Sequence, residues 1–210
     1  MVKIYFRITT RAVEICHYFL KGIVQKGDTV VDATAGNGFD TLFLADLVGD
    51  FGKVYSFDIQ EKAIEETRQR LHEKGFLNRV ELNCTGHENL KRYVNQPVKT
   101  VVFNLGYLPR GNSEIVTKGI STVKALEDSL DILSPEGIIC LVVYWGHEGG
   151  PEERELVENY VSHLSSVQWD VLNLSFPNRI NAPFVIVIQK KYGGSLSNEK
   201  CQAKENQTNY

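Results

Sequence analysis

Short apolar runs recur along the chain, and most are followed by a segment whose apolar residues have helical spacing. Alternation of this kind predicts an α/β domain built on a mainly parallel sheet, with helices on both faces. We expect seven strands, at residues 29–33, 53–59, 79–83, 100–105, 137–144, 171–176 and 184–189.

Five amphipathic segments are expected to form the helices. The first precedes the first strand, Gly75 is expected to stop the third, and Pro151 with its two following glutamates favours the start of the fifth. The apolar positions that define the five helices are Ala12, Ile15, Cys16, Phe19, Leu20 and Ile23; Leu44, Leu47 and Val48; Ile64, Thr67 and Leu71; Ile115, Gly119, Val123, Leu126, Leu130 and Leu133, closed by a turn at 134–137; and Leu156, Tyr160 and Leu164.

The connection between the last two runs is short. Only residues 177–183 separate them, whereas a parallel crossover needs about a dozen residues or more. These two strands should therefore pair as an antiparallel hairpin. A parallel sheet completed by one reversed strand is similar to the Rossmann-like fold of class I S-adenosylmethionine-dependent methyltransferases.

Composition narrows the class of protein. The chain has 210 residues, and 23 Lys plus Arg against 26 Asp plus Glu leave a net charge of −3, which argues against binding nucleic acid by bulk charge alone. We expect one domain over residues 1–190 and a disordered polar tail over 191–210. The scattered cysteines predict neither a disulfide framework nor a metal site. No apolar run is long enough for a membrane helix and no signal-peptide pattern is present, so we expect a cytoplasmic protein.

The stretch V-V-D-A-T-A-G-N-G-F-D-T leads from the first strand into a helix. Gly36 and Gly38 allow a tight turn and a close approach to a ligand. Asp32 would meet a cationic amino acid group, and Asp58, at the end of the second strand, would accept hydrogen bonds from ribose hydroxyls. Position 41 is Thr rather than a third glycine, so S-adenosylmethionine is favoured over NAD. The alternatives are a turn or capping role for Asp32 and a helix N-cap role for Asp58.

Two further loops follow strands three and four. His87 lies where folds of this kind contact adenine, although it would equally suit a solvated loop. Asn104-Leu105-Gly106-Tyr107 resembles the N-P-P-Y tetrapeptide of amino-group methyltransferases, in which the amide binds the target amine and the ring stacks on the base. The alternative is that Asn104 caps a turn and that Tyr107 is a packed surface aromatic.

The motifs together resemble one family. They are A-V-E-I-C-H at 12–17, D-A-T-A-G-N-G-F-D-T-L-F-L-A at 32–45, F-D-I-Q at 57–60, F-N-L-G-Y-L-P at 103–109 and V-V-Y-W-G-H-E-G-G at 142–150. The chain is similar, over about residues 10 to 190, to the small bacterial methyltransferases labelled "putative rRNA methylase", a family that includes the tRNA 5-(aminomethyl)-2-thiouridine methyltransferase. One departure is Phe39, where the family pattern has His.

The resemblance implies methyl transfer from S-adenosylmethionine to the aminomethyl group of 5-aminomethyl-2-thiouridine at the tRNA wobble position, with the anticodon stem-loop as partner. The cofactor residues that it implies are Asp32, Gly36, Asn37, Gly38, Asp40, Asp58, Gln60, His87 and Asn104. The open alternatives are methylation of rRNA, of a small molecule or of a protein amine, and an inactive binding module. The oligomeric state is also open, a homodimer included.

An alkylamine is largely protonated at neutral pH, so a group that accepts its proton is expected near the acceptor site. His147, in the glycine-rich segment after the fifth strand, is the first candidate and His17 the second, although either could be structural. Asn104 and Tyr107 would complete the reacting centre.

Basic residues gather in two segments despite the acidic total. We expect Arg110 and Lys118 to contact phosphates of the RNA, although a merely solvated surface explains them equally well. The two segments contain Lys3, Arg7, Arg11, Lys21 and Lys26, and Lys99, Arg110, Lys118 and Lys124, whereas residues 127–158 contain Arg154 as their one Lys or Arg.

Overall fold

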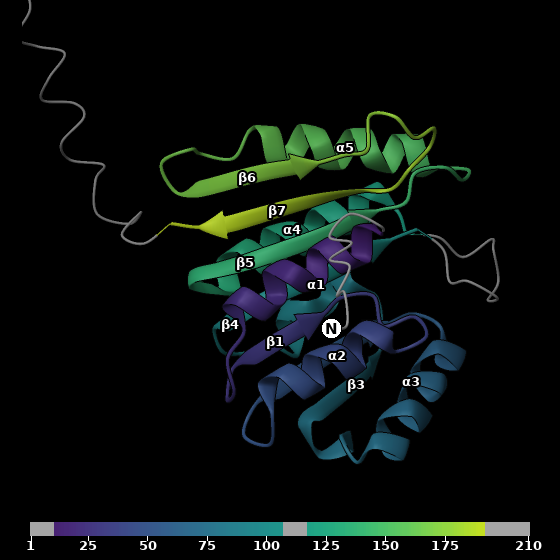
Figure 1. Ribbon diagram of the computed structural model, residues 1–210, viewed down its shortest axis with the longest axis vertical. Coiled ribbons are helices and arrows are strands. Elements are labelled where there is room, and N and C mark those ends of the chain that lie inside the picture. Colours follow the sequence, from purple (N-terminus) through teal and green to yellow (C-terminus); the bar gives the residue numbers. More distant parts are fainter. Residues whose placement is uncertain (1–10, 107–116, 192–210) are drawn as a thin grey trace, which may run out of the picture.

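The computed structural model describes residues 11–106 and 117–191. A seven-stranded sheet has the order β3-β2-β1-β4-β5-β7-β6 (Figure 1). Strands β1 to β5 are parallel, and β7 runs antiparallel to both β5 and β6. The strands are β1 (Thr29–Asp32), β2 (Lys53–Asp58), β3 (Val80–Cys84), β4 (Val98–Leu105), β5 (Leu133–Val143), β6 (Trp169–Leu174) and β7 (Phe184–Lys190).

Helices cover both faces of the sheet, because each face carries its own layer of buried apolar side chains. In Figure 1, α1 lies in front of the sheet and α4 lies behind it. The helices are α1 (Ala12–Ile23), α2 (Phe39–Val48), α3 (Glu61–Lys74), α4 (Gly119–Ile132) and α5 (Gly150–Ser162), with short 3₁₀ turns η1 (Leu77–Arg79) and η2 (His87–Arg92). No helix in the described ranges is both long and apolar enough to cross a membrane.

The expected α/β fold and the antiparallel hairpin of β6 and β7 are confirmed. The expected helix end at Leu133 was wrong, because α4 ends at Ile132 and Leu133 already pairs with Val98. Residues 134–137 then bulge out of the ladder, with Glu136 at a positive φ of 60°. The expected tail lies outside the described residues, except for Lys191.

The expected buried face of α5 was also partly wrong. Leu156 is 43% exposed, while Val157 and Val161 are buried. Leu164 lies beyond the end of the helix at Ser162, although it still packs against the core. The buried stripe is shifted by one position, because Glu153, one turn before Val157, also points inward.

The central strands β1 and β4 lie side by side, and the chain leaves them toward opposite edges of the sheet. Their carboxyl ends therefore flank a topological switch point, which is where open α/β sheets bind ligands. This edge of the sheet is on the right-hand side of Figure 1.

Candidate active site

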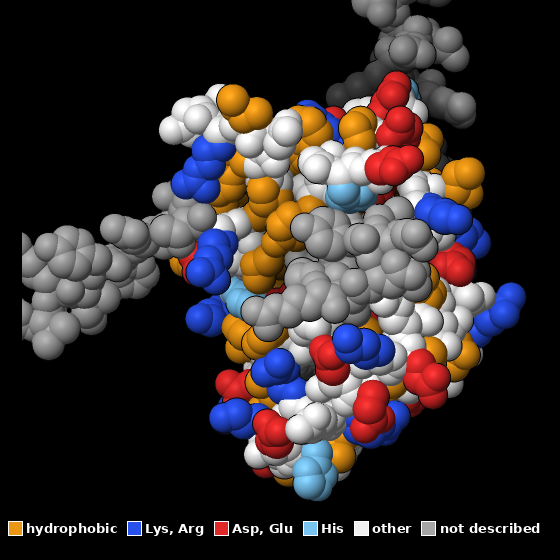
Figure 2. Space-filling model, turned by 90° about the vertical axis from the view of Figure 1, so that its right-hand side faces the viewer, with side chains coloured by type: hydrophobic (Ala, Val, Ile, Leu, Met, Phe, Trp, Pro, Cys, Tyr) orange, Lys and Arg blue, Asp and Glu red, His pale blue; other side chains and the backbone are white. Residues whose placement is uncertain are grey.

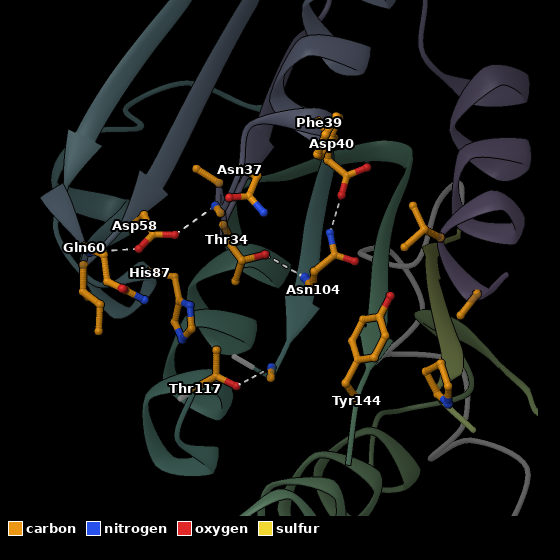
Figure 3. A pocket seen from close by; sticks show the side chains of 18 of the residues that line it. Thr34, Asn37, Phe39, Asp40, Asp58, Gln60, His87, Asn104, Thr117 and Tyr144 are labelled. Atoms are coloured by element: carbon orange, nitrogen blue, oxygen red, sulfur yellow. Dashed lines mark hydrogen bonds between the residues drawn. The ribbon is translucent and has the colours of Figure 1, made fainter. Parts of the chain in front are cut away.

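A cavity of about 1460 Å³ opens at the carboxyl edge of the sheet. It extends from the first helix across the ends of β1, β2 and β4 to the segment between β6 and β7. Pockets for one drug-sized ligand have volumes of roughly 300 to 1,000 Å³, so this one has room for two reactants side by side. Figure 3 shows side chains that line it.

The glycine loop after β1 is held against α3. Arg70 Nε donates to the carbonyl oxygen of Asn37 at 2.9 Å, and Thr67 Oγ1 donates to that of Gly36 at 3.3 Å. A Cβ at Gly38, whose φ is +77°, would lie 2.7 Å from Thr67 Oγ1. Gly36 and Asn37 line the cavity, whereas Gly38 faces α3 instead. The glycine at position 38 is therefore required by packing of the loop on α3.

Asp58 ends β2 and lines the cavity. Its two carboxylate oxygens accept backbone N–H bonds from Gly36 and from Gln60, both at 2.9 Å (Figure 3). Burial raises the pKa of Asp58, and these N–H bonds oppose the rise. A carboxylate has about four acceptor positions, so roughly two remain for hydroxyl groups of a ligand.

His87 is the first residue of η2, is buried and lines the cavity. Burial lowers the pKa of His87, although the charge of Glu88 opposes the shift, and the lowered pKa favours the neutral ring. Its Nε2 atom has no hydrogen-bond partner among the described residues. A buried nitrogen without a partner is costly, and a ligand with a polar ring edge would satisfy it.

Asp32 was expected to contact a ligand, but the structure places it below the loop and outside the cavity lining. Its carboxylate accepts from Thr41 Oγ1 at 2.6 Å and from the backbone N–H of Thr34 at 3.2 Å. Burial, and then the charge of Asp40, raise the pKa of Asp32 to about 7. Asp32 thus supports the loop from beneath.

No three His, Cys, Asp or Glu residues within 11–106 and 117–191 are grouped to hold a metal ion.

Asn104, near the end of β4, lies at the centre of the cavity wall. Its backbone N–H donates to Thr34 Oγ1 at 2.7 Å, and its side-chain Nδ2 donates to Asp40 (Figure 3). The other oxygen of Asp40 accepts from His17 Nε2. Asn104 Oδ1 is buried and has no hydrogen-bond partner among the described residues. A residue of the cavity lining thus carries a buried acceptor without a partner, on an amide whose NH₂ group is held by Asp40.

Of the two expected proton acceptors, His17 lines the cavity and His147 does not. His147 bonds through Nδ1 to the carbonyl oxygen of Glu148 at 2.9 Å, and its Nε2 lies 3.6 Å from where a Cβ of Gly106 would be. It thus lies beside the end of β4. Tyr107 and Arg110 fall outside the described residues.

Sequence reasoning missed the bonds between Gly106 and Thr117. Gly106 and Thr117 bond to each other, because the N–H of Gly106 donates to Thr117 Oγ1 and its carbonyl oxygen accepts from the N–H of Thr117, both at 2.9 Å. Buried Glu153 accepts from the hydroxyls of Thr117 at 2.6 Å and Thr122 at 2.7 Å. The sequence showed Glu153 only as a typical first-turn acid of a helix.

Tyr144 was likewise missed. Tyr144 directly follows β5 and lines the cavity. In Figure 3 its ring extends toward Asn104. Burial raises the pKa of its phenol, and the charge of Asp40 adds to this shift. An aromatic residue of the lining thus lies next to the end of β4, because the N–H of Tyr144 donates to the carbonyl oxygen of Leu105 at 2.9 Å.

Basic side chains from several elements lie around the cavity. Figure 2 shows Lys and Arg side chains along the left of this face and acidic ones at its upper right. Lys118, which was expected to contact a phosphate, is exposed and belongs to the lining. The basic residues of the lining are Arg11, Lys62, Arg70, Lys118 and Arg179.

Comparison with known proteins gives a consistent picture. Residues 54–190 match the family described as "Putative rRNA methylase". A relative in Arabidopsis thaliana, named "tRNA (mnm(5)s(2)U34)-methyltransferase, chloroplastic", is 41% identical, and the match covers 86% of this chain and 70% of the relative.

Two solved structures are similar over most of their length. A "putative rRNA-methylase" from Clostridium thermocellum is 42% identical, with a TM-score of 0.85, and the match covers 86% of this chain and 98% of that one. A "putative methyltransferase" from Streptococcus mutans in complex with SAH is 36% identical, with a TM-score of 0.79 and the same two coverages. Both likenesses thus extend well beyond the glycine loop after β1.

Proposed function

Because this chain belongs to the "Putative rRNA methylase" family and is a class I S-adenosylmethionine-dependent methyltransferase, we propose that it methylates the aminomethyl group of 5-aminomethyl-2-thiouridine at the tRNA wobble position. The observation that carries the proposal is the buried Oδ1 atom of Asn104, which has no partner among the described residues. A primary amine donates hydrogen bonds, so it suits this acceptor. The name of the Arabidopsis thaliana relative supports tRNA as the substrate.

The residues of the cavity suit S-adenosylmethionine. Asp58 would accept hydrogen bonds from the ribose hydroxyls, and neutral His87 would bond to the adenine edge through its unused Nε2 atom. Gly36, Asn37 and Gln60 would line the same end. When bound, this cofactor supplies an electrophilic methyl group on a sulfonium.

Asn104 would orient the nucleophile. An uncharged primary amine that donates one N–H to Asn104 Oδ1 keeps its lone pair free to attack, whereas a protonated amine has none. In-line transfer depends mainly on such alignment, which can account for several kcal/mol of a barrier. Asp40 is hydrogen-bonded to the amide of Asn104 and adds a negative charge there, and the imidazole of His17 is hydrogen-bonded to the same carboxylate through Nε2. Tyr107 would stack on the uracil ring.

The substrate RNA would meet the basic residues around the cavity. Lys118 and Arg110 would neutralise phosphates of the anticodon stem-loop, and Arg11 and Arg179 lie on the same lining as Lys118. The proposal includes a cytoplasmic location and a single catalytic domain over residues 1–190.

A methyl-transfer assay tests the proposal. Purified protein and labelled S-adenosylmethionine are incubated with tRNA from cells that lack this protein, and the nucleosides are separated by mass spectrometry. We expect label in methylated 5-aminomethyl-2-thiouridine only, and labelling slower by about 10² or more with the Asn104→Ala variant. Label in rRNA, in protein or in a small amine, but not in tRNA, would contradict the proposal. Cofactor binding without transfer to any of them would indicate an inactive binding module.

A further inference from the structure

Three side chains from three different elements form a continuous hydrogen-bonded chain along the cavity. His17 comes from α1, Asp40 from the first turn of α2, and Asn104 from β4. Asp40 accepts from His17 at one carboxylate oxygen and from Asn104 at the other. All three residues line the cavity, and the chain ends at the unused Oδ1 atom of Asn104.

The carboxylate of Asp40 decides how the amide of Asn104 is turned. An amide side chain can present either its oxygen or its NH₂ group in one direction, since the two have nearly the same shape. A carboxylate only accepts hydrogen bonds, so it selects the NH₂ group and leaves the oxygen on the other side. The backbone N–H of Asn104, held by Thr34 Oγ1 at 2.7 Å, fixes the position from which the side chain starts.

His17 in turn holds the carboxylate. Its Nε2–H donates to Asp40, and its ring stacks on Phe43 with centroids 3.8 Å apart and an interplanar angle of 9°. Stacking on Phe43 thus fixes the plane of the imidazole, and the N–H group on the edge of the ring donates to Asp40. Without this donor, the Asp40 carboxylate would keep Asn104 as its one side-chain partner among the described residues, and it would be free to rotate away from Asn104.

We propose that His17 is a positioning residue that acts through Asp40 to keep the Asn104 oxygen directed toward the acceptor amine. This role rests on the proposed function for the identity of the amine. It predicts that loss of the His17 donor slows the methyl-transfer step while cofactor affinity stays unchanged, because the cofactor-side groups Asp58 and His87 lie at the other end of the cavity (Figure 3).

Two substitutions separate the donor of His17 from its ring. His17→Phe keeps a ring that can stack on Phe43 but removes the donor, and His17→Gln removes the ring but keeps an N–H group at similar reach. We expect the single-turnover rate at saturating tRNA and cofactor to fall roughly 10- to 100-fold in the Phe variant, as for loss of one hydrogen bond to a charged group. The Gln variant should stay within about threefold of the wild type. His72→Phe, on the exposed face of α3, is the matched control.

A double-mutant cycle distinguishes this role from a general structural one. In an Asn104→Ala background the amide that His17 positions is gone, so His17→Phe should have no further effect on the rate. Asp40→Asn offers a second route if the Phe variant does not fold. The amide of Asp40→Asn has one acceptor oxygen, whereas His17 and Asn104 both donate to position 40. The rate should therefore fall in Asp40→Asn, and adding His17→Gln should not restore it.

The NMR signal of the Asn104 side-chain amide tests positioning without any methyl transfer. In protein labelled with ¹⁵N-asparagine, the signal is assigned by its loss in Asn104→Ala. We expect the same amide shifts and slow solvent exchange in wild type and His17→Gln, and changed shifts with faster exchange in His17→Phe. An unchanged signal in the Phe variant, equal rate losses in Phe and Gln, or a full effect without Asn104 would each overturn the proposal. If wild-type protein does not methylate tRNA, the proposed function fails, and the amide signal still decides the role of His17.

Discussion

Replacement of Asp58 should weaken cofactor binding, and the loss should depend on whether the ligand carries the ribose hydroxyls. The carboxylate already accepts N–H bonds from Gly36 and Gln60, each at 2.9 Å, so its remaining acceptor positions are the ones open to a ligand. A buried hydrogen bond to a charged acceptor contributes about 1.5 to 3 kcal/mol. In the Ala variant, water can bind to the freed backbone N–H groups, so part of this free energy is recovered. We expect Asp58→Ala to cost about 1 to 3 kcal/mol of binding free energy, roughly 5- to 150-fold in Kd.

Calorimetry with two ligands isolates the ribose contribution. S-adenosylhomocysteine and its 2′,3′-dideoxy analogue are titrated into wild type and into Asp58→Ala. Removal of the hydroxyls should weaken binding to the wild type and have little effect on the variant, because the acceptor for those hydroxyls is already gone. Asp58→Asn is not a mild change here, since its NH₂ group would face one of two backbone N–H donors. An equal loss from the dideoxy analogue in wild type and Asp58→Ala would refute the assignment of Asp58 to the ribose.

Three further expectations concern the acceptor, the RNA surface and pH. Asn104→Ala should lower kcat by about 10² or more with little change in cofactor affinity, and near-normal turnover would show that the residue only shapes a turn. Lys118→Ala should raise KM for tRNA and reduce the salt slope of binding by about 1, whereas Lys74→Ala on α3 should not, and equal slopes would exclude a phosphate contact. The pKa of Asp32 is raised to about 7 from an ordinary value of 3.8, so the folded protein holds a proton there that the unfolded chain releases. The stabilisation from this proton is therefore fully present below about pH 4 and is lost as the pH rises to about 7, by at most about 1.4 kcal/mol per pH unit. Asp32→Asn mimics the protonated acid. In urea unfolding, this variant should therefore lack the part of the pH dependence of stability that Asp32 causes.

Features set by local geometry could be predicted from the sequence. The connection 177–183 is too short for a parallel crossover, so the hairpin of β6 and β7 followed from chain length alone. Gly75 adopts the left-handed conformation at the end of α3, as its place after the last apolar position indicated. The position of Asn104 at the carboxyl edge followed from its place at the end of a strand.

Features that depend on contacts between distant segments could not be predicted. Asp40 lines the cavity, and the bonds of its side chain run to His17, 23 positions before it, and to Asn104, 64 positions after it. Nothing in the spacing of these residues indicates that they meet. The direction of the Asp32 side chain could not be predicted for a related reason, because it depends on a bond from Thr41, a position that in the sequence indicated only the lack of a third glycine.

The most direct test of the account is nucleoside mass spectrometry of tRNA from cells that lack this protein. We expect 5-aminomethyl-2-thiouridine to accumulate at the wobble position, and its methylated form to return when wild-type protein, but not Asn104→Ala, is supplied. An unchanged content of methylated nucleoside in those cells would contradict the proposed function.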